Sequence, residues 1–245
     1  MTAGDHVTDL VRTGDRDRYL ASLFAPDEAR PALLALAAFN IEIGRIAVSV
    51  SEPQLGLVRQ QWWLDTLDAI SAGQEVPAHP VAQALARAIE RHGLPLPALR
   101  SLVEAREFDL YADPMPDLLA LETYLGQTSS AMIQLGSLVL AGKRAAASAA
   151  AAGLAGVAHG LAMLLNSGDA RHLPAELSPV AAQAHARQRL AEARGLAGTV
   201  AAEALPAFLP VALTELYLAA AWRSRPPLAV TRQFVMWRAA RGNRF

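Results

Sequence analysis

Three polar side chains, Asn40, Glu42 and Arg45, interrupt an otherwise apolar run between residues 39 and 50. Glu42 and Arg45 are three residues apart, so on a helix they share a face and can form an ordinary ion pair. Asn40 lies on a different flank of the same helix. These side chains are either ordinary helix residues or a ligand site, because carboxylates bind magnesium and arginines bind phosphate.

Other carboxylates occur at spacings that suit either a magnesium site or a charged surface. Asp65 and Asp68 are three residues apart and, together with other ligands, could hold magnesium. They lie away from the apolar side of their segment, which favours a solvated face. Asp109 follows Arg106 by three residues, with glutamates at 104 and 107. A charge network within one helix is the simplest interpretation of that group.

The motifs that identify common reactions do not occur in this sequence. The six histidines are scattered and show no zinc-ligand spacing. There is no G-x-S-x-G, no Walker A sequence and no G-x-G-x-x-G. The motifs alone therefore identify no chemistry.

The stretch after Trp222 contains six arginines and no acidic residue, and Phe234, Met236 and Trp237 lie among them. A basic helix with aromatic side chains can lie on an anionic membrane or on a partner protein. A last helix that packs on the protein and leaves a solvated basic rim is the alternative, and the sequence leaves both open. The predicted membrane or partner surface consists of Arg232, Trp237, Arg238 and Arg241.

The elements that must position these side chains are helices. Ala, Leu, Arg, Gln and Glu are abundant, apolar residues recur at a spacing near 3.6, and no series of strands and turns is evident. Ser51 is the expected cap of a helix with Pro53 in its first turn. We expect one all-α domain, residues 1–245, of eight to ten helices. The predicted ranges are about 26–50, 53–73, 80–93, 96–112, 117–140, 147–166, 177–199, 203–223 and 226–241.

Composition and charge narrow the class of protein. The chain has 245 residues, 53% of them apolar and 18% charged, so it can bury a large core. Its formal net charge of −1 gives no field that would gather nucleic acid. The lack of cysteine and of an apolar signal region suits a cytoplasmic protein. Residues 145–165 are long enough to span a membrane, but their alanine content favours a closely packed helix.

The order of motifs along the chain resembles the squalene/phytoene synthase family, the head-to-head prenyltransferases of the all-α terpenoid synthase fold. The resemblance implies helices around a central cavity and a reaction on prenyl diphosphates. In that reaction, Mg²⁺ held by two aspartate-rich clusters stabilises the leaving pyrophosphate. The segments that carry the resemblance are DRYLASLFAPDEARPALLALAAFN, QQWWLDTLDAI, HPVAQALARAI, EAREFDL, ETYLGQTSSAMIQLG, AHGLAMLL…RHLP and TRQFVMWRAARGNRF.

Both aspartate-rich clusters are depleted in this sequence. The first should follow Ala38-Phe39, where the corresponding positions are Gly44, Arg45 and Val48. The second should precede Leu173-Pro174, where the short segment NSGDARH keeps one acid. A cation at position 45 opposes a metal site. If the chain is active, the remaining candidates for catalytic acids are Glu42, Asp109 and Asp169.

Arginines could replace the metal as a clamp for a diphosphate, with Arg45, Arg106 or Arg171 turned inward. Such a clamp would support binding but would leave ionisation of the substrate poorly supported. Together with Asn40 and Glu42, these arginines are the candidate ligand-binding residues.

The sequence A-F-N-x-E at 38–42, followed by S-V-S-E at 49–52, is similar to a non-catalytic branch of the family. That branch contains the mitochondrial complex I assembly factor with a phytoene-synthase-like domain and its bacterial relatives. Asn40 and Glu42 then belong to a branch signature within a former metal-binding helix. The resemblance implies a protein that kept the fold and lost the reaction.

The main hypothesis is a catalytically degenerate binding or assembly factor, in the cytoplasm or peripheral at the inner face of the membrane. Its partner would be a subunit of a respiratory membrane complex, the membrane surface or an isoprenoid lipid, and no metal or cofactor is expected. This hypothesis predicts that Glu42 is paired with a basic group. The alternative is an active, Mg²⁺-dependent prenyltransferase that condenses prenyl diphosphates, which requires inward-facing carboxylate clusters.

Overall fold

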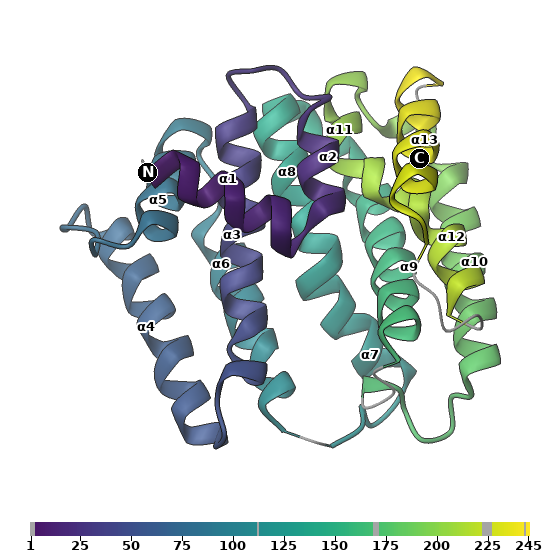
Figure 1. The fold of residues 1–245 in the computed structure, drawn as a ribbon, viewed down its shortest axis with the longest axis horizontal. Helices are drawn as coiled ribbons and strands as arrows, with labels where there is room; N and C mark the ends of the chain where they lie inside the picture. The colour runs from purple at the N-terminus through teal and green to yellow at the C-terminus, as the bar shows by residue number, and fades with distance from the viewer. Residues whose placement is uncertain (1–2, 112, 169–171, 222–226, 243) are drawn as a thin grey trace. The chain divides into compact units, whose positions relative to one another are not determined.

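The structure is a computed structural model that describes residues 3–111, 113–168, 172–221, 227–242 and 244–245 (Figure 1). Within these ranges the chain forms helices and turns and contains no strand. The prediction of an all-α fold is confirmed. The chain divides into two compact units, unit 1 with residues 1–112 and unit 2 with residues 113–245. The single domain and the central cavity stay predictions.

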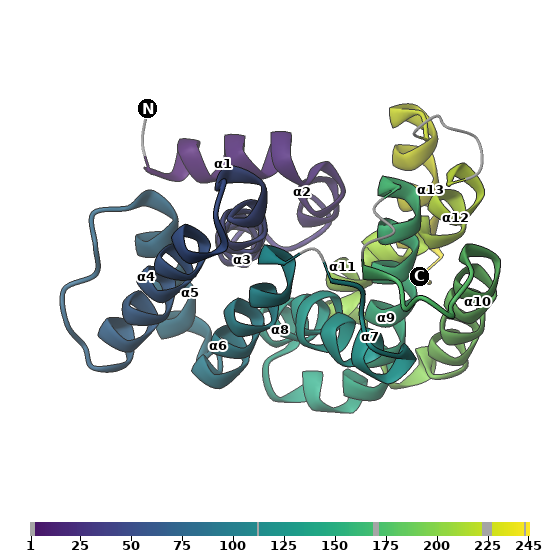
Figure 2. The same ribbon diagram turned by 90° about the horizontal axis from the view of Figure 1, so that it is seen from below.

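Unit 1 is organised around one buried helix, α3. Its residues Leu36, Phe39 and Ile43 are among the largest fully buried side chains, and their spacing places them on one face. α3 packs against α1 and α5, an arrangement visible in Figure 2. The elements are α1 (Ala3–Gly14), α2 (Arg16–Ser22), α3 (Arg30–Arg45), η1 (Ala47–Ser49), α4 (Pro53–Ser71), α5 (Pro80–His92), α6 (Leu96–Ala105) and η2 (Arg106–Leu110).

The ends of these helices test the capping predictions. α5 begins at Pro80 and ends before Gly93, whose φ of 59° is left-handed, as the sequence predicted. α4 begins at Pro53 with Glu52 at the cap position and no side-chain cap bond. The prediction that Ser51 caps this helix is therefore wrong. Pro53 takes the first helical position, so Ser51 lies one residue too early to cap it.

Two helices of unit 1 are shorter than predicted because their ends tighten into 3-10 turns. α3 begins at Arg30, because residues 26–29 form a turn closed by a bond from Ala29 N–H to the Pro26 oxygen. It ends at Arg45, and η1 follows. α6 ends at Ala105 and η2 follows it directly. This change of helix type sets the directions of the polar side chains in η2.

Unit 2 has α9 at its centre, in contact with α8, α10 and α12, and both views show α10 beside it (Figures 1 and 2). The elements are α7 (Leu118–Leu125), the π-helical η3 (Gly126–Ser130), α8 (Ala131–Ala141), η4 (Gly142–Ser148), α9 (Ala149–Ser167), α10 (Pro179–Gly195), η6 (Ala197–Thr199), η7 (Ala202–Ala204), α11 (Leu205–Phe208), η8 (Leu209–Leu213), α12 (Thr214–Ala220) and α13 (Ala229–Arg241).

The alanine-rich helix α9 packs closely on its neighbours, as predicted. A Cβ added at Gly156 would lie 2.3 Å from the Cα of Ser130, and one at Gly160 would lie 2.5 Å from the Oγ of Ser129. Only glycine lets α9 approach η3 this closely. The stretches 118–167 and 202–220 are long and apolar enough to cross a membrane. Since 61% of the most apolar window in the first is buried, a core helix explains it.

Two long helices predicted for unit 2 are interrupted. The predicted helix 117–140 contains η3 between α7 and α8. The predicted helix 203–223 is divided into η7, α11, η8 and α12. Pro206 and Pro210 explain the second interruption, because proline lacks the N–H that a continuous helix needs.

Candidate functional site

Arg106 is the centre of a polar cluster in unit 1. Its Nη1 lies 3.1 Å from the Oδ2 of Asp109, and its Nη2 donates a hydrogen bond to the Oδ1 of Asn40 at 3.3 Å. The side chain of Asp109 is only 10% exposed, so the guanidinium neutralises a nearly buried carboxylate. The cluster connects η2 to α3, and its Arg106–Asp109 pair is one part of the charge network predicted for residues 104–109.

The backbone explains why these groups meet. In a 3-10 helix, side chains three residues apart lie directly above one another, so η2 stacks Asp109 on Arg106. On α3, Asn40 and Gly44 are four residues apart and share a face. A Cβ added at Gly44 would lie 3.9 Å from the Cζ of Arg106, so the guanidinium lies beside this glycine. No sequence pattern predicted that contact, because it joins segments that are distant along the chain.

The positions at which the family resemblance implies magnesium ligands do not suit Mg²⁺. Gly44, Arg45 and Val48 occupy the expected metal-binding positions and have no carboxylate. The side-chain oxygens of Asp109 and Asn40 both contact the guanidinium of Arg106. In the ranges that the structure describes, no group of three or more His, Asp or Glu residues could hold a metal ion.

The second predicted cluster falls partly outside the described residues. Asp169, the one acid of that segment, and Arg171, a predicted ligand-binding residue, are both among those left out. Asp65 and Asp68 lie on the exposed face of α4, where Asp65 accepts a hydrogen bond from Gln61 and Asp68 pairs with Arg100. The interpretation of these two acids as a solvated face is confirmed.

The opposite flank of α3 lines a pocket of about 480 Å³ in unit 1. Glu42 and Arg45 both line it, but no ion pair joins them in the described part of the chain. The Nη2 of Arg45 instead lies near Gly14, where an added Cβ would be 2.9 Å away. The ion pair predicted for Glu42 is therefore wrong, because the arginine extends along α1.

Aromatic side chains form another wall of this pocket, which the sequence did not reveal. The rings of Trp62 and Trp63 contact each other edge to face with centroids 4.9 Å apart, and both contact the ring of His79. Arg59 lines the pocket too, and its Nη1 donates to the Oγ of Ser49 at 2.6 Å. The Nδ1 atom of His79 is buried and has no hydrogen-bond partner among the residues that the structure describes. The pocket thus combines apolar rings with a carboxylate and two guanidiniums.

Unit 2 contains a charge network between α7 and α10. Arg189 donates from Nε and Nη2 to the two carboxylate oxygens of Glu122, at 2.6 and 3.2 Å, and His185 lies 2.8 Å from the same carboxylate. Burial raises the pKa of Glu122, but the hydrogen bonds from Arg189 and His185 outweigh it, so the pKa lies below its usual value. This network joins two helices and faces no pocket described in unit 2.

The four residues of the predicted C-terminal surface all lie on α13, but they differ in exposure and in contacts. Trp237 and Arg238 are exposed, and the guanidinium of Arg241 lies over the Trp237 ring at 4.9 Å from its centroid. Arg232 is half-buried and donates to the hydroxyl of Tyr217 at 3.3 Å. Arg232 therefore attaches α13 to α12, and the other three residues remain available at the surface.

Comparison with known proteins agrees with the fold. Two solved structures cover most of the chain at low identity, so they establish the fold alone. A squalene synthase from Alicyclobacillus acidocaldarius matches at 17% identity with a TM-score of 0.74, over 92% of this chain and 95% of its own. A dehydrosqualene synthase in complex with ligand matches at 13% identity with a TM-score of 0.73, over 98% and 95%.

Relatives with higher identity are named NADH dehydrogenase (ubiquinone) complex I, assembly factor 6. The protein from Bos taurus is 38% identical over 127 residues, which cover 52% of this chain but only 38% of the relative. The protein from Rattus norvegicus is 30% identical over 239 residues, 86% of this chain and 71% of its own length. The family model for squalene/phytoene synthase matches residues 11–167. The chain therefore belongs to the squalene/phytoene synthase family.

Proposed function

We propose that the chain is a non-catalytic member of this family that acts as a binding protein in the assembly of a respiratory membrane complex. The observation that carries the proposal is the position of Arg106. Its guanidinium lies beside Gly44, where the resemblance implies a metal-binding aspartate, and it contacts Asn40 and Asp109. A cation in this place opposes Mg²⁺ binding and so supports loss of the family's reaction.

The names of the relatives support the assembly role. Several are complex I assembly factor 6 proteins, including those from Bos taurus, Rattus norvegicus and Mus musculus. We extend the role to this chain, with a subunit of an NADH dehydrogenase complex as its partner. We propose that the chain acts in the cytoplasm at the inner face of the membrane and needs no cofactor.

The partner surface that we propose surrounds the pocket beside Glu42. Leu55, Val58 and Trp62 follow one exposed face of α4 at the spacing of a helical stripe, with exposures of 52%, 68% and 38%. Exposed apolar side chains grouped in this way are typical of protein interfaces, and tryptophan often contributes much of the binding energy. Glu42 adds a carboxylate without an ion-pair partner in the described residues, which an arginine or lysine of the partner would neutralise.

A test of the chemistry incubates the purified chain with farnesyl diphosphate and Mg²⁺ and follows pyrophosphate release. We expect none under conditions in which a squalene synthase turns over. Release that stops in Glu42→Gln would favour the alternative, an active prenyltransferase. Release of the same size in wild type and in Glu42→Gln, checked for a contaminating phosphatase, would place the reaction elsewhere and would also contradict the proposal.

A test of the assembly role deletes the coding sequence in the source organism and measures assembled NADH dehydrogenase on native gels. We expect the assembled complex to fall several-fold and to recover with the wild-type chain. Trp62→Ala should restore it poorly, whereas Leu119→Ala, a matched loss of an exposed apolar side chain on α7, should restore it fully. Normal assembly in the deletion strain would overturn the assembly role.

A further inference from the structure

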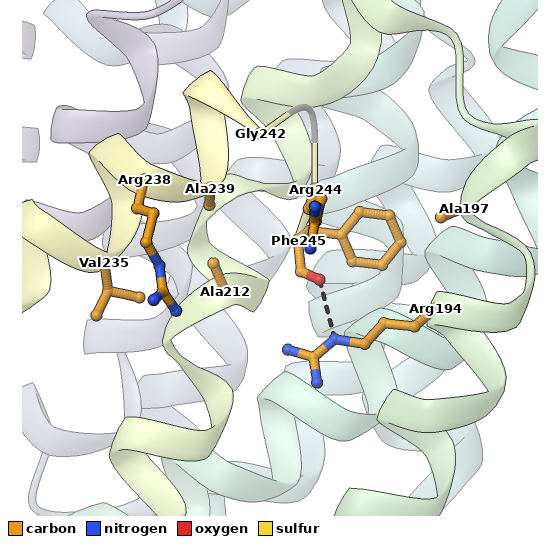
Figure 3. A pocket seen from close by; sticks show the side chains of 9 residues that line it. All are labelled: Arg194, Ala197, Ala212, Val235, Arg238, Ala239, Gly242, Arg244 and Phe245. Carbon is orange, nitrogen blue, oxygen red and sulfur yellow. Dashed lines mark hydrogen bonds between the residues drawn. The ribbon is translucent and has the colours of Figure 1, made fainter.

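Three arginines of unit 2 line one pocket of about 600 Å³, and no acidic residue lines it (Figure 3). Arg194 is in the last turn of α10, Arg238 is on α13 and Arg244 follows α13. The other lining residues are small or apolar, apart from the backbone of Phe245. Like charges repel when they gather in one place, so three guanidiniums around one pocket favour the binding of an anion there.

The donors of this pocket are largely unused. The Nε of Arg194 donates to the main-chain oxygen of Phe245 at 3.0 Å, the dashed line in Figure 3. Within the described ranges, the side chains of Arg238 and Arg244 form no hydrogen bond or ion pair. Each guanidinium presents planar N–H pairs that match two oxygens of a phosphate group.

The backbone around the pocket is held in place by packing. α13 packs on η8, which contributes Ala212 to the pocket wall. The ring of Phe245 is buried and lies against Phe208, with centroids 4.8 Å apart. This contact anchors Phe245 and thereby holds the adjacent Arg244 at the pocket.

An exposed apolar stripe on α13 lies next to the pocket. Val230, Phe234 and Trp237 are 75%, 58% and 45% exposed, and the Phe234 and Trp237 rings stack with centroids 6.1 Å apart. Arg238 is four residues after Phe234, so the two side chains are neighbours on the helix. Arg238 thus lies between the stripe and the pocket. Aromatic residues beside arginines are typical of helices that lie at the surface of a membrane.

We propose that this pocket binds the phosphate of an anionic phospholipid headgroup while Val230, Phe234 and Trp237 enter the lipid surface. The proposal gives the membrane attachment of an assembly factor a defined site, but it rests on unit 2 alone and does not require the assembly role. The protein's net charge is −1, so general attraction to an anionic surface is weak and the local arginines must supply the contact.

The test measures sedimentation of the full chain with vesicles in phosphate-free buffer. Vesicles of phosphatidylcholine alone are compared with vesicles that also contain phosphatidylglycerol. We expect binding to the second kind only. The double variant Arg238→Gln/Arg244→Gln should weaken it about 25-fold, at about fivefold for each charge removed near the lipid surface. The double variant Arg144→Gln/Arg187→Gln removes the same charge from exposed positions of unit 2 outside the pocket and should bind like wild type.

Two further arms identify the source of the phosphate. Phe234→Ser should weaken vesicle binding several-fold, and inorganic phosphate in solution should compete only weakly. Strong binding of inorganic phosphate together with unchanged vesicle binding by Phe234→Ser would mean a soluble ligand and would overturn the lipid assignment. Equal loss in the two arginine double variants would mean unspecific attraction and would overturn the pocket.

A second copy of the chain is the remaining occupant to be excluded. Analytical ultracentrifugation in the absence of lipid measures the oligomeric state of wild type and of Phe234→Ser. We expect monomers for both. A wild-type dimer that Phe234→Ser dissociates, with no vesicle binding, would assign the stripe to self-association and overturn the proposal.

Discussion

Arginine has opposite roles in two regions of this molecule. In unit 1, Arg106 contacts Asp109 and Asn40 of its own chain, and its side chain is only 20% exposed. In unit 2, Arg194, Arg238 and Arg244 line a pocket without an acid. An arginine whose donors are used by its own chain stabilises the fold, whereas arginines with unused donors around a cavity are available to a ligand.

The contrast bears on how an enzyme fold can change its use. The helix face implied to hold magnesium is filled by an intramolecular ion pair, which fixes the fold and opposes the metal. Glycine at position 44, where the resemblance implies a carboxylate, leaves room for the guanidinium of Arg106. The binding roles that we propose lie at other surfaces, in the pocket beside Glu42 and in the arginine pocket of unit 2.

The largest effect is expected when Arg106 is replaced by methionine. The substitution leaves the nearly buried carboxylate of Asp109 without its guanidinium, so the free energy of unfolding should fall by about 3 kcal/mol. Urea unfolding measures the loss. The double variant Arg106→Met/Asp109→Leu should recover part of it, because both charges are then removed. A loss below about 1 kcal/mol for the single variant would show that Arg106 contributes little to the stability of the fold.

Arg189 is a second arginine whose donors are used by its own chain. Its bidentate bond to Glu122 stabilises the fold, as the contacts of Arg106 do. Glu122→Gln should lower the free energy of unfolding by about 2 kcal/mol at neutral pH. The pKa of Glu122 is lowered in the folded state, so its contribution is complete above the usual value of 4.5. That contribution disappears as pH falls through the lowered pKa.

Chemical unfolding of wild type and Glu122→Gln at a series of acidic pH values measures this dependence. The difference between the two proteins should shrink as the pH is lowered, since the wild-type carboxylate becomes protonated. Glu192 also has a lowered pKa through its bond to Arg189, so some acid sensitivity remains in the variant. A difference that stays constant down to the acid transition would contradict the assignment.

Gly44→Ala tests whether position 44 needs glycine to admit Arg106. The added Cβ would meet Arg106 at 3.9 Å, an ordinary contact, so the loss of backbone freedom in the unfolded chain should dominate. We expect thermal unfolding to show a gain of about 0.5–1 kcal/mol. Gly156→Ala is the matched control on α9, where the Cβ meets Ser130 at 2.3 Å, and it should destabilise by more than about 1 kcal/mol.

The smallest effect on stability is expected for Arg238→Gln. Its side chain is exposed and has no partner among the described residues, so the free energy of unfolding should change by less than about 0.5 kcal/mol. Urea unfolding beside the vesicle assay separates the two roles. A loss comparable with that of Arg106→Met would show that Arg238 is structural and would break the comparison.

Local physics predicted the helical fold and several helix boundaries, and the resemblance in the order of motifs indicated the family. Pro80 and Gly93 delimit α5 because proline suits a first turn and glycine accepts a left-handed φ. The Arg106–Asp109 pair, at a spacing of three residues, belongs to the charge network predicted for residues 104–109. The Glu42–Arg45 pair has the same spacing and does not form, because Arg45 finds space beside Gly14 on α1. Spacing along the chain thus limits which pairs are possible but does not choose among them.

What the sequence determined by itself is local: the helical character of the chain, the depletion of acids at positions 44, 45 and 48, and the basic, aromatic character of the C-terminus. Tertiary structure decided which polar groups meet. Asn40 and Arg106 are 66 residues apart, and Arg194 and Phe245 are 51 apart. Contacts of this kind depend on how helices pack, and packing is set by the whole core rather than by any short segment.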